Sequence, residues 1–148
     1  MLIDQLLEFY YKYDKFQSSY LSEEKARKIF DHLIAKGRVH HYSSDNALLG
    51  YGESIRINYE TLGKIICGYN IYGMLDEIDV NQGNIAYLAN VTIHPEHRGT
   101  VVLKYLRNEF LVKNYSCEYF VGHSLTKKHQ PIKVFKRSDA MMKWIKEV

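Results

Sequence analysis

Cysteine is scarce in this sequence, and long apolar runs are missing from it. The 148 residues contain two cysteines, Cys67 and Cys117, and neither belongs to a CxxC or other closely spaced set. This scarcity argues against a disulfide framework and against a thiol-rich metal site. No run approaches the roughly 20 apolar residues that a membrane-spanning helix needs. We therefore expect a protein with no membrane span.

The charge pattern of a secretory signal is missing too. A signal peptide places basic residues ahead of its apolar region, whereas this chain has Asp4 near its start and no basic residue before Lys12. Together with the scarcity of cysteine, this pattern predicts a protein of the reducing cytoplasm.

The excess of charge of one sign is small. The formal net charge is +3, and the composition is 46% hydrophobic and 25% charged, close to the average of soluble globular domains. Basic residues are spread along the chain with acidic residues among them, which argues against a dedicated nucleic-acid surface. One hydrophobic core can bury roughly two thirds of the surface of a chain of this length. We expect a single domain covering residues 1–148.

Helical and then alternating periodicity organises the first part of the chain. Ser22 is a typical helix N-cap, and Gly37 is a typical residue at a helix end. Residues 59–80 fit either a short helix or a strand and loop, and both remain open. The predicted elements are helices over residues 2–13 and 22–37 and a hairpin of strands over residues 39–42 and 48–58.

The second part has the order strand, helix, strand. A polar turn at residues 81–84 precedes the strongest strand pattern of the chain, residues 85–93. A helical face then runs over residues 99–113, and a short apolar strand follows at residues 117–121. This order predicts a right-handed crossover between neighbouring parallel strands. In the tail we expect a strand at residues 132–135 and a closing helix at residues 138–148.

The segment that joins this strand to this helix has a distinctive sequence. It runs His94-Pro95-Glu96-His97-Arg98-Gly99 and passes directly into the helix. Residues 85–106 resemble motif A of the GCN5-related N-acetyltransferase (GNAT) family, a strand followed by an Arg-Gly-x-Gly-x-Gly/Ala turn and a helix. The resemblance implies an α/β fold with a mixed central sheet flanked by helices, and the order of elements extends it over about residues 1–124.

The resemblance implies an acyl-CoA site at this turn. A strand-to-helix turn aims unpaired amides and the positive end of the helix dipole at one point, which suits a pyrophosphate. The implied reaction is transfer of an acyl group, most simply acetyl, from acyl-CoA to an amine of an unknown acceptor. The implied cofactor-binding residues are Val91, Thr92 and Ile93, whose backbone would run along the pantetheine arm, and Arg98, Gly99, Thr100, Val101 and Val102, whose amides would face the phosphates.

Two positions depart from the motif. Val101 stands where the family has its second glycine, and Leu103 stands where it has glycine or alanine. A β-branched side chain at Val101 would crowd a pyrophosphate. The alternative function is therefore a non-catalytic protein that keeps the GNAT-like fold and binds a macromolecular partner.

Acyl transfer needs a group that removes a proton from the amine. Glu53, on the strand before the motif strand, is the candidate that we assign, and Asp76, Glu77 and Asp79 are alternatives. Each also fits a solvated surface carboxylate. The tyrosine that the family uses as general acid has no counterpart here. We assign proton handling after the strand at residues 117–121 to His123 and Ser124.

Two further groups of residues carry side chains that bind metals or anions in other settings. His94 and His97 form an HxxH pair that His123 could join, but the pair lies on a turn rather than on a helix face or zinc knuckle, and we expect no metal site. Residues 127–137 are the most basic stretch, which either binds nucleic acid or an acidic partner or is a solvated face.

Overall fold

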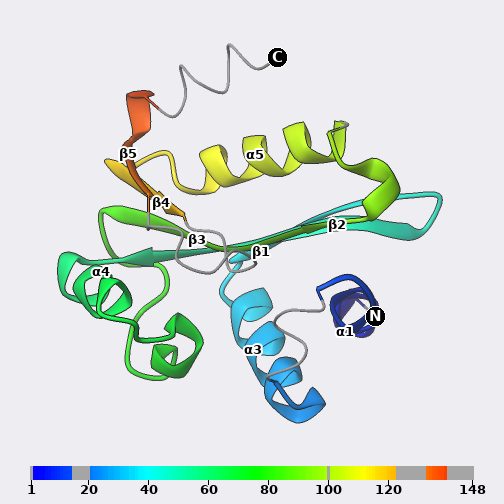
Figure 1. Cartoon of the computed structure of the whole chain (residues 1–148), viewed down its shortest axis with the longest axis horizontal. Helices are drawn as coiled ribbons and strands as arrows, with labels where there is room; N and C mark the ends of the chain where they lie inside the picture. Colours follow the sequence, from blue (N-terminus) through cyan, green and yellow to red (C-terminus); the bar gives the residue numbers. More distant parts are fainter. Residues whose placement is uncertain (1, 15–20, 100, 123–132, 140–148) are drawn as a thin grey trace. The chain divides into compact units, whose positions relative to one another are not determined.

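The computed structural model describes residues 2–14, 21–99, 101–122 and 133–139 (Figure 1). The chain divides into two compact units, Met1–Ser54 with Asn90–Lys113, and Ile55–Ala89 with Asn114–Val148. Among the described residues, the strands form one five-stranded sheet in the order β1-β2-β3-β4-β5. The strands are β1 (Val39–Ser44), β2 (Ala47–Ile57), β3 (Ile85–Ile93), β4 (Tyr119–Gly122) and β5 (Lys133–Lys136).

The helices of the first unit lie on both faces of its strands. Figure 1 shows α1 (Leu2–Tyr13) and α3 (Glu23–Ala35) on one face of β1 and β2, and α5 (Val101–Lys113) on the other. The predicted cap is confirmed, because the Ser22 hydroxyl accepts a hydrogen bond from the Lys25 amide. Gly37 follows α3 with a φ of +71°, a conformation that glycine adopts without a Cβ penalty.

One core of the first unit lies between α1, α3 and β2. Tyr51 of β2 is fully buried there, and its ring packs edge-on against Phe9 and Phe30. The inner faces of both helices follow the helical apolar spacing of the sequence. The buried residues of this core are Ile3, Leu6, Leu7, Phe9, Tyr10, Ala26, Phe30 and Tyr51.

The second core lies under α5. A Cβ added at Gly50 of β2 would lie 2.9 Å from Cγ1 of Val102, so the glycine makes room for the helix. Val102, Leu106 and Phe110 are buried at a spacing of four residues. Val101 lies within the segment predicted to form this face, but its side chain is 59% exposed and lies off the buried stripe.

The hairpin turns more tightly than predicted. β1 reaches Ser44 and β2 begins at Ala47, so the turn comprises Asp45 and Asn46, with φ values of 52° and 62°. Asp and Asn tolerate this left-handed conformation better than other non-glycine residues, and such turns match the twist of paired strands.

The ambiguous segment at residues 59–80 is helical in the second unit. It forms α4 (Tyr59–Ile66), which Asn58 caps by accepting from the Thr61 amide, and the 3₁₀ helix η1 (Ile71–Met74). The strand-and-loop alternative is therefore wrong.

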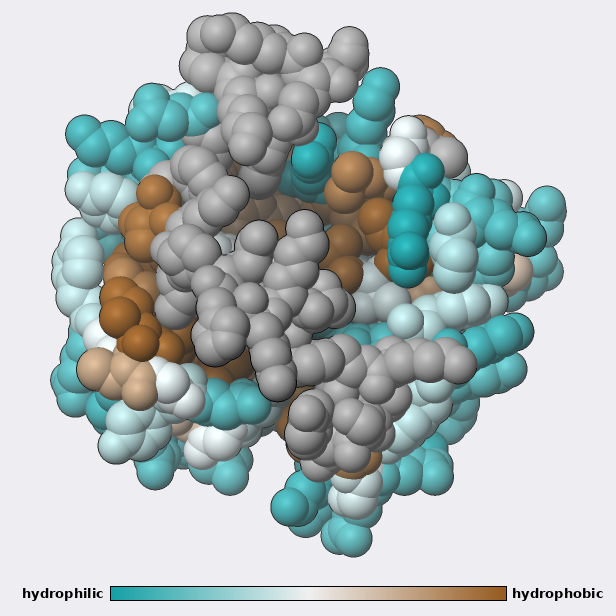
Figure 2. All heavy atoms as spheres, viewed as in Figure 1, coloured by the Kyte–Doolittle hydropathy of each residue, from teal (hydrophilic) through white to brown (hydrophobic). Residues whose placement is uncertain are grey.

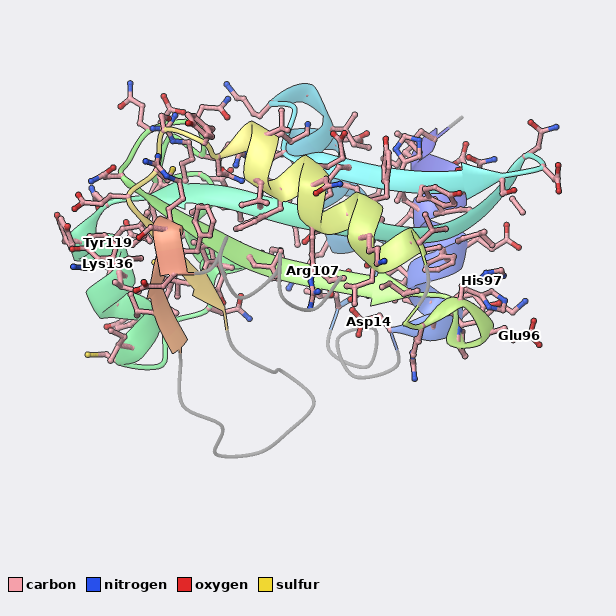
Figure 3. All side chains as sticks on the ribbon, turned by 90° about the horizontal axis from the view of Figure 1, so that it is seen from above. Asp14, Glu96, His97, Arg107, Tyr119 and Lys136 are labelled. Carbon is pink, nitrogen blue, oxygen red and sulfur yellow. The ribbon has the colours of Figure 1, made fainter. Side chains whose placement is uncertain are left out.

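The predicted parallel pairing of β3 with β4 is confirmed. The two strands are parallel, with residues from Ile85 to Tyr87 opposite residues from Tyr119 to Val121. β5 then pairs antiparallel with β4, and Tyr119 lies opposite Lys136 (Figure 3). The predicted strand of the tail is confirmed, whereas most of the closing helix lies outside the described residues.

The surface of the described residues is mainly hydrophilic on the face that Figure 2 shows, with smaller groups of hydrophobic residues among them. Within the described part of the chain, none of the helices combines the length and apolar character that crossing a membrane requires.

Candidate functional site

The turn between β3 and α5 is held in place by its own backbone and by β2. The His94 amide donates to the carbonyl oxygen of Leu49 at 2.8 Å, and His94 Nδ1 accepts from the Glu96 amide at 3.1 Å, which starts the 3₁₀ helix η2 (Pro95–His97). The ring of Tyr13, the last residue of α1, lies 4.9 Å from the His94 ring. Glu96 and His97 project outward from this turn (Figure 3).

The space around Gly99, just before α5 begins, is open. Its φ is +75°, and a Cβ added there would meet no atom within 4 Å. Arg98 and Gly99 are exposed, and the first turn of α5 contains no acidic residue. The amides at the start of a helix have no intrahelical acceptors and carry partial positive charge, so this end of α5 can receive an anion.

The structure brings the predicted cofactor-binding residues into one stretch, the end of β3 and the start of α5. Val91 is 36% exposed, whereas Thr92 and Ile93 are each 8% exposed. The Val102 side chain belongs to the core under α5, so only its amide can face a ligand. Thr100 lies outside the described residues.

A hydrogen-bonded polar cluster lies on the other face of the same stretch of β3. The Asn90 amide nitrogen donates to Asp14 Oδ2 at 3.0 Å and to the Tyr51 hydroxyl at 2.9 Å. The Thr92 hydroxyl donates to Asn90 Oδ1 at 3.2 Å. The Asn90 side chain thus connects the end of α1 with β2 and β3, and it fixes the Asp14 carboxylate against the sheet.

Two tyrosine hydroxyls in and beside this cluster are kept neutral. Burial, and then the Glu53 and Asp14 carboxylates, raise the pKa of Tyr51 well above its usual value, although the hydrogen bond with Thr92 lowers it. The pKa of Tyr10 is also raised, first by burial and then by Asp14. Neutral hydroxyls can both donate and accept, which lets them relay protons or hold a water molecule.

Glu53 of β2 raises the pKa of both tyrosines. Its side chain is 2% exposed, so the alternative of a solvated surface carboxylate is wrong for this residue. A proton from a substrate can reach it only through another group. Its burial on β2 was not apparent from the sequence, because a strand of alternating pattern leaves the more polar face exposed in most sheets.

The other candidates for proton handling are not part of this cluster. Asp76, Glu77 and Asp79 are exposed, and Asp79 Oδ1 accepts from the Asn81 amide within a turn. His123, Ser124 and most of the basic stretch lie outside the described residues. Among the residues that the structure does describe, no group of three or more His, Cys, Asp and Glu side chains is placed to hold a metal ion.

Asp14 and Asn90 are the residues of this site that sequence reasoning missed. Asp14 directly follows the last residue of α1, and an acidic residue is unfavourable at the negative end of a helix dipole. Asn90 is a polar residue inside the strongest strand pattern of the chain, and asparagine is depleted in strands. Each is a local anomaly, but no sequence pattern links two residues 76 positions apart.

Comparison with known proteins shows the fold. No protein-family model and no curated protein sequence matches the chain. A solved structure described as "GphF GNAT-like decarboxylase in complex with isobutyryl-CoA" superposes with a TM-score of 0.60 at 14% sequence identity, over 81% of this chain and 60% of that one. The chain thus spans about three fifths of the length of this neighbour. It has a GNAT-like fold, with a mixed α/β sheet flanked by helices.

Proposed function

We propose that the chain binds acyl-CoA at the β3–α5 turn and transfers the acyl group to an amine. The observation that carries the proposal is the open turn at Gly99, where an added Cβ would meet no atom within 4 Å, next to a first turn of α5 that holds no acidic residue. A pyrophosphate at this point would accept hydrogen bonds from the amides of residues 99–102, and Arg98 would add a cationic contact.

The part of β3 beyond its pairing with β4 supports a place for the pantetheine arm. In the described residues the register of β3 with β4 covers Ile85 to Tyr87, and β3 continues to Ile93. The backbone from Val91 to Ile93 is the segment that we assign to the arm. The structural neighbour is in complex with isobutyryl-CoA, which supports acyl-CoA as the ligand class, although that protein is a decarboxylase.

We expect CoA and acetyl-CoA to raise the melting temperature of the protein. A ligand that binds only the folded state stabilises it by mass action, by about 2.7 kcal/mol at a concentration of 100 times its dissociation constant. The measurement is thermal unfolding across a titration of CoA, with pantetheine, which lacks the nucleotide and the pyrophosphate, as the matched ligand. Absence of a shift at millimolar CoA would favour the non-catalytic alternative, a protein that binds a macromolecular partner.

Replacing Val101 with glycine tests whether the Val101 side chain leaves room for the pyrophosphate of CoA. Its side chain is 59% exposed and is not part of the core, so we expect the Val101→Gly variant to fold and to bind CoA with an affinity equal to that of the parent or slightly lower. The small loss reflects the cost of glycine in a helix, about 0.5–1 kcal/mol relative to alanine. The measurement is calorimetric titration of both proteins with CoA.

The opposite outcomes of this titration are equally informative. If only the Val101→Gly variant binds CoA, the valine blocks the site in the natural chain, and the non-catalytic alternative is preferred. Binding by neither protein would remove the phosphate site and leave the fold alone. Leu103→Ala serves as the control, because Leu103 departs from the same motif but packs against the core under α5.

A further inference from the structure

Asp14 occupies a position that helix stability does not explain. It follows α1, and its amide donates to the Tyr10 carbonyl oxygen at 2.9 Å, so its carboxylate lies at the negative end of the helix dipole. There it accepts a hydrogen bond from Asn90. The carboxylate is half-buried, it opposes the helix dipole, and a residue of β3 fixes its orientation. These features fit a binding or catalytic role better than a role in helix stability.

The Tyr10 hydroxyl gives a second, independent observation. Tyr10 is 2% exposed, and its hydroxyl has no hydrogen-bond partner among the described residues. Asp14 and Glu53 both act on it electrostatically and raise its pKa, in addition to the larger effect of burial. A buried polar atom without a partner is costly and marks a place for a water molecule or a polar group of a ligand.

The cluster also lies on the strand segment assigned to the cofactor. Asn90 and Thr92 point to the α1 face of β3, where they meet Asp14 and Tyr51, whereas Ile93 packs with Val102 on the α5 face. One short stretch of β3 therefore offers its backbone to the pantetheine arm and its polar side chains to whatever approaches from the α1 side.

We propose that Asp14, oriented by Asn90 and accompanied by the unpaired Tyr10 hydroxyl, binds a primary ammonium group and removes its proton. The inference rests on the proposed acyl-CoA site, and it assigns the acceptor class as a primary amine that is charged at neutral pH. The half-buried Asp14 carboxylate and the buried Tyr10 hydroxyl would each accept one of the three ammonium hydrogens, and their removal from water strengthens such hydrogen bonds.

The reaction balances without a further reactant. Asp14 takes one proton from the ammonium, and the free amine attacks the thioester carbonyl carbon. The N–C bond forms and the C–S bond breaks, so the sulfur leaves with the electron pair and receives the second amine proton. Asp14 then releases its proton to water. The products are an amide, free CoA and one proton, and the base contributes roughly 10²–10⁴-fold to the rate of such a step.

The test uses two CoA thioethers as probes, S-(3-aminopropyl)-CoA and the uncharged S-propyl-CoA. We expect the parent to bind the amino compound at least tenfold more tightly than the propyl compound, because only the ammonium group makes a charged hydrogen bond in this partly buried site. The Asp14→Asn variant should lose this preference and bind S-propyl-CoA as the parent does. The control is Glu8→Gln, which removes an exposed carboxylate from the same helix and should keep the preference.

A second measurement follows release of the CoA thiol from acetyl-CoA in the presence of simple primary amines. The Asp14→Asn variant should lower the rate at least 100-fold. Tyr10→Phe should lower it about tenfold. If Tyr10→Phe only raises the free energy of unfolding and leaves the rate unchanged, the hydroxyl is a structural defect and its assigned role fails.

Failure of this inference differs from failure of the proposed function. If the parent binds S-propyl-CoA but does not prefer the amino compound, or if Asp14→Asn keeps the preference, Asp14 does not bind the amine. If the parent binds neither probe, the acyl-CoA site itself is wrong. If Asp14→Asn does not fold, Asp14→Ser takes its place, because serine keeps a short polar acceptor at the end of α1. Loss of the preference for the amino compound then supports the role of Asp14, and retention of it contradicts that role.

Discussion

The Gly83→Ala variant should lose a large part of the stability of the protein. Gly83 has a φ of +131°, and an alanine Cβ there would overlap the carbonyl carbon and oxygen of Ile57 and lie 3.0 Å from the Asn58 nitrogen. Backbone atoms cannot move aside as a flexible side chain can. The strained φ and the overlap each cost roughly 1–3 kcal/mol, which we expect to sum to about 2–6 kcal/mol against a typical total of about 5–15 kcal/mol.

The substitution at Gly83 would also break hydrogen bonds to its backbone. The Gly83 carbonyl oxygen accepts from Arg56 Nε at 2.9 Å and from Arg56 Nη2 at 2.7 Å. A shift of the turn breaks these charged hydrogen bonds and disturbs the start of β3 two residues later. Since β3 carries both the proposed cofactor segment and the polar cluster, any folded fraction should also bind CoA more weakly.

The matched control for this prediction is Gly63→Ala. Gly63 lies inside α4, and a Cβ added there meets no atom within 4 Å. Alanine should therefore raise the free energy of unfolding by about 0.5–1 kcal/mol, the difference in helix propensity. Denaturant unfolding of the parent and both variants measures the two changes. A Gly83→Ala protein within about 1 kcal/mol of the parent would show that the turn can relax.

The periodic parts of the fold could be predicted from the sequence. The helices α1 and α3, the hairpin, and the β3–α5–β4 crossover each have a strong apolar period bounded by capping or turn residues. Residues 59–80 could not be assigned, because α4 is short and its Ile66 is 60% exposed, which blurs the apolar face. The turn at Gly83 was predicted as a turn, but only the structure shows why glycine is required there.

The candidate site also has a part that the sequence could predict and a part that it could not. Its phosphate-binding half is one contiguous stretch, residues 91–102, so a motif could identify it. Its polar half joins Asp14, Tyr51 and Asn90 from three elements, and only the packing of α1 against the sheet brings these side chains together. Glu53 was selected as a candidate base only from its position on the strand before the motif strand. Because it is buried, it cannot contact substrate directly, and it acts instead on the pKa of Tyr10 and Tyr51.

Acidification should destabilise the protein through His40. This residue of β1 is 4% exposed, and neither ring nitrogen has a hydrogen-bond partner among the described residues. It lies opposite Gly52, whose added Cβ would be 2.6 Å from His40 Nε2, so the ring fills the space above the glycine. Burial, and then the positive charges of Lys113 and Arg38, lower the pKa of His40 from 6.5 to about 4.

The sign of the effect follows from the two protonation states. Above pH 6.5 His40 is neutral in both the folded and the unfolded chain, and it contributes nothing to the pH dependence. Between pH 6.5 and about 4 the unfolded chain binds a proton that the folded chain does not, so the free energy of unfolding falls as the pH falls. With about 1.36 kcal/mol for each pH unit between the two pKa values, the loss approaches about 3 kcal/mol near the lower pKa.

The His40→Phe variant isolates this contribution, because a phenyl ring keeps the packing on Gly52 and does not titrate. We expect its free energy of unfolding at neutral pH to equal or exceed that of the parent, since two unpaired polar atoms are removed. Its advantage over the parent should then grow by about 3 kcal/mol between about pH 7 and about pH 4 in denaturant unfolding. His41→Gln, at the neighbouring half-buried position, should keep the acid sensitivity of the parent. If the free energies of unfolding of the parent and His40→Phe fall in parallel as the pH falls, His40 is not the cause of the acid sensitivity.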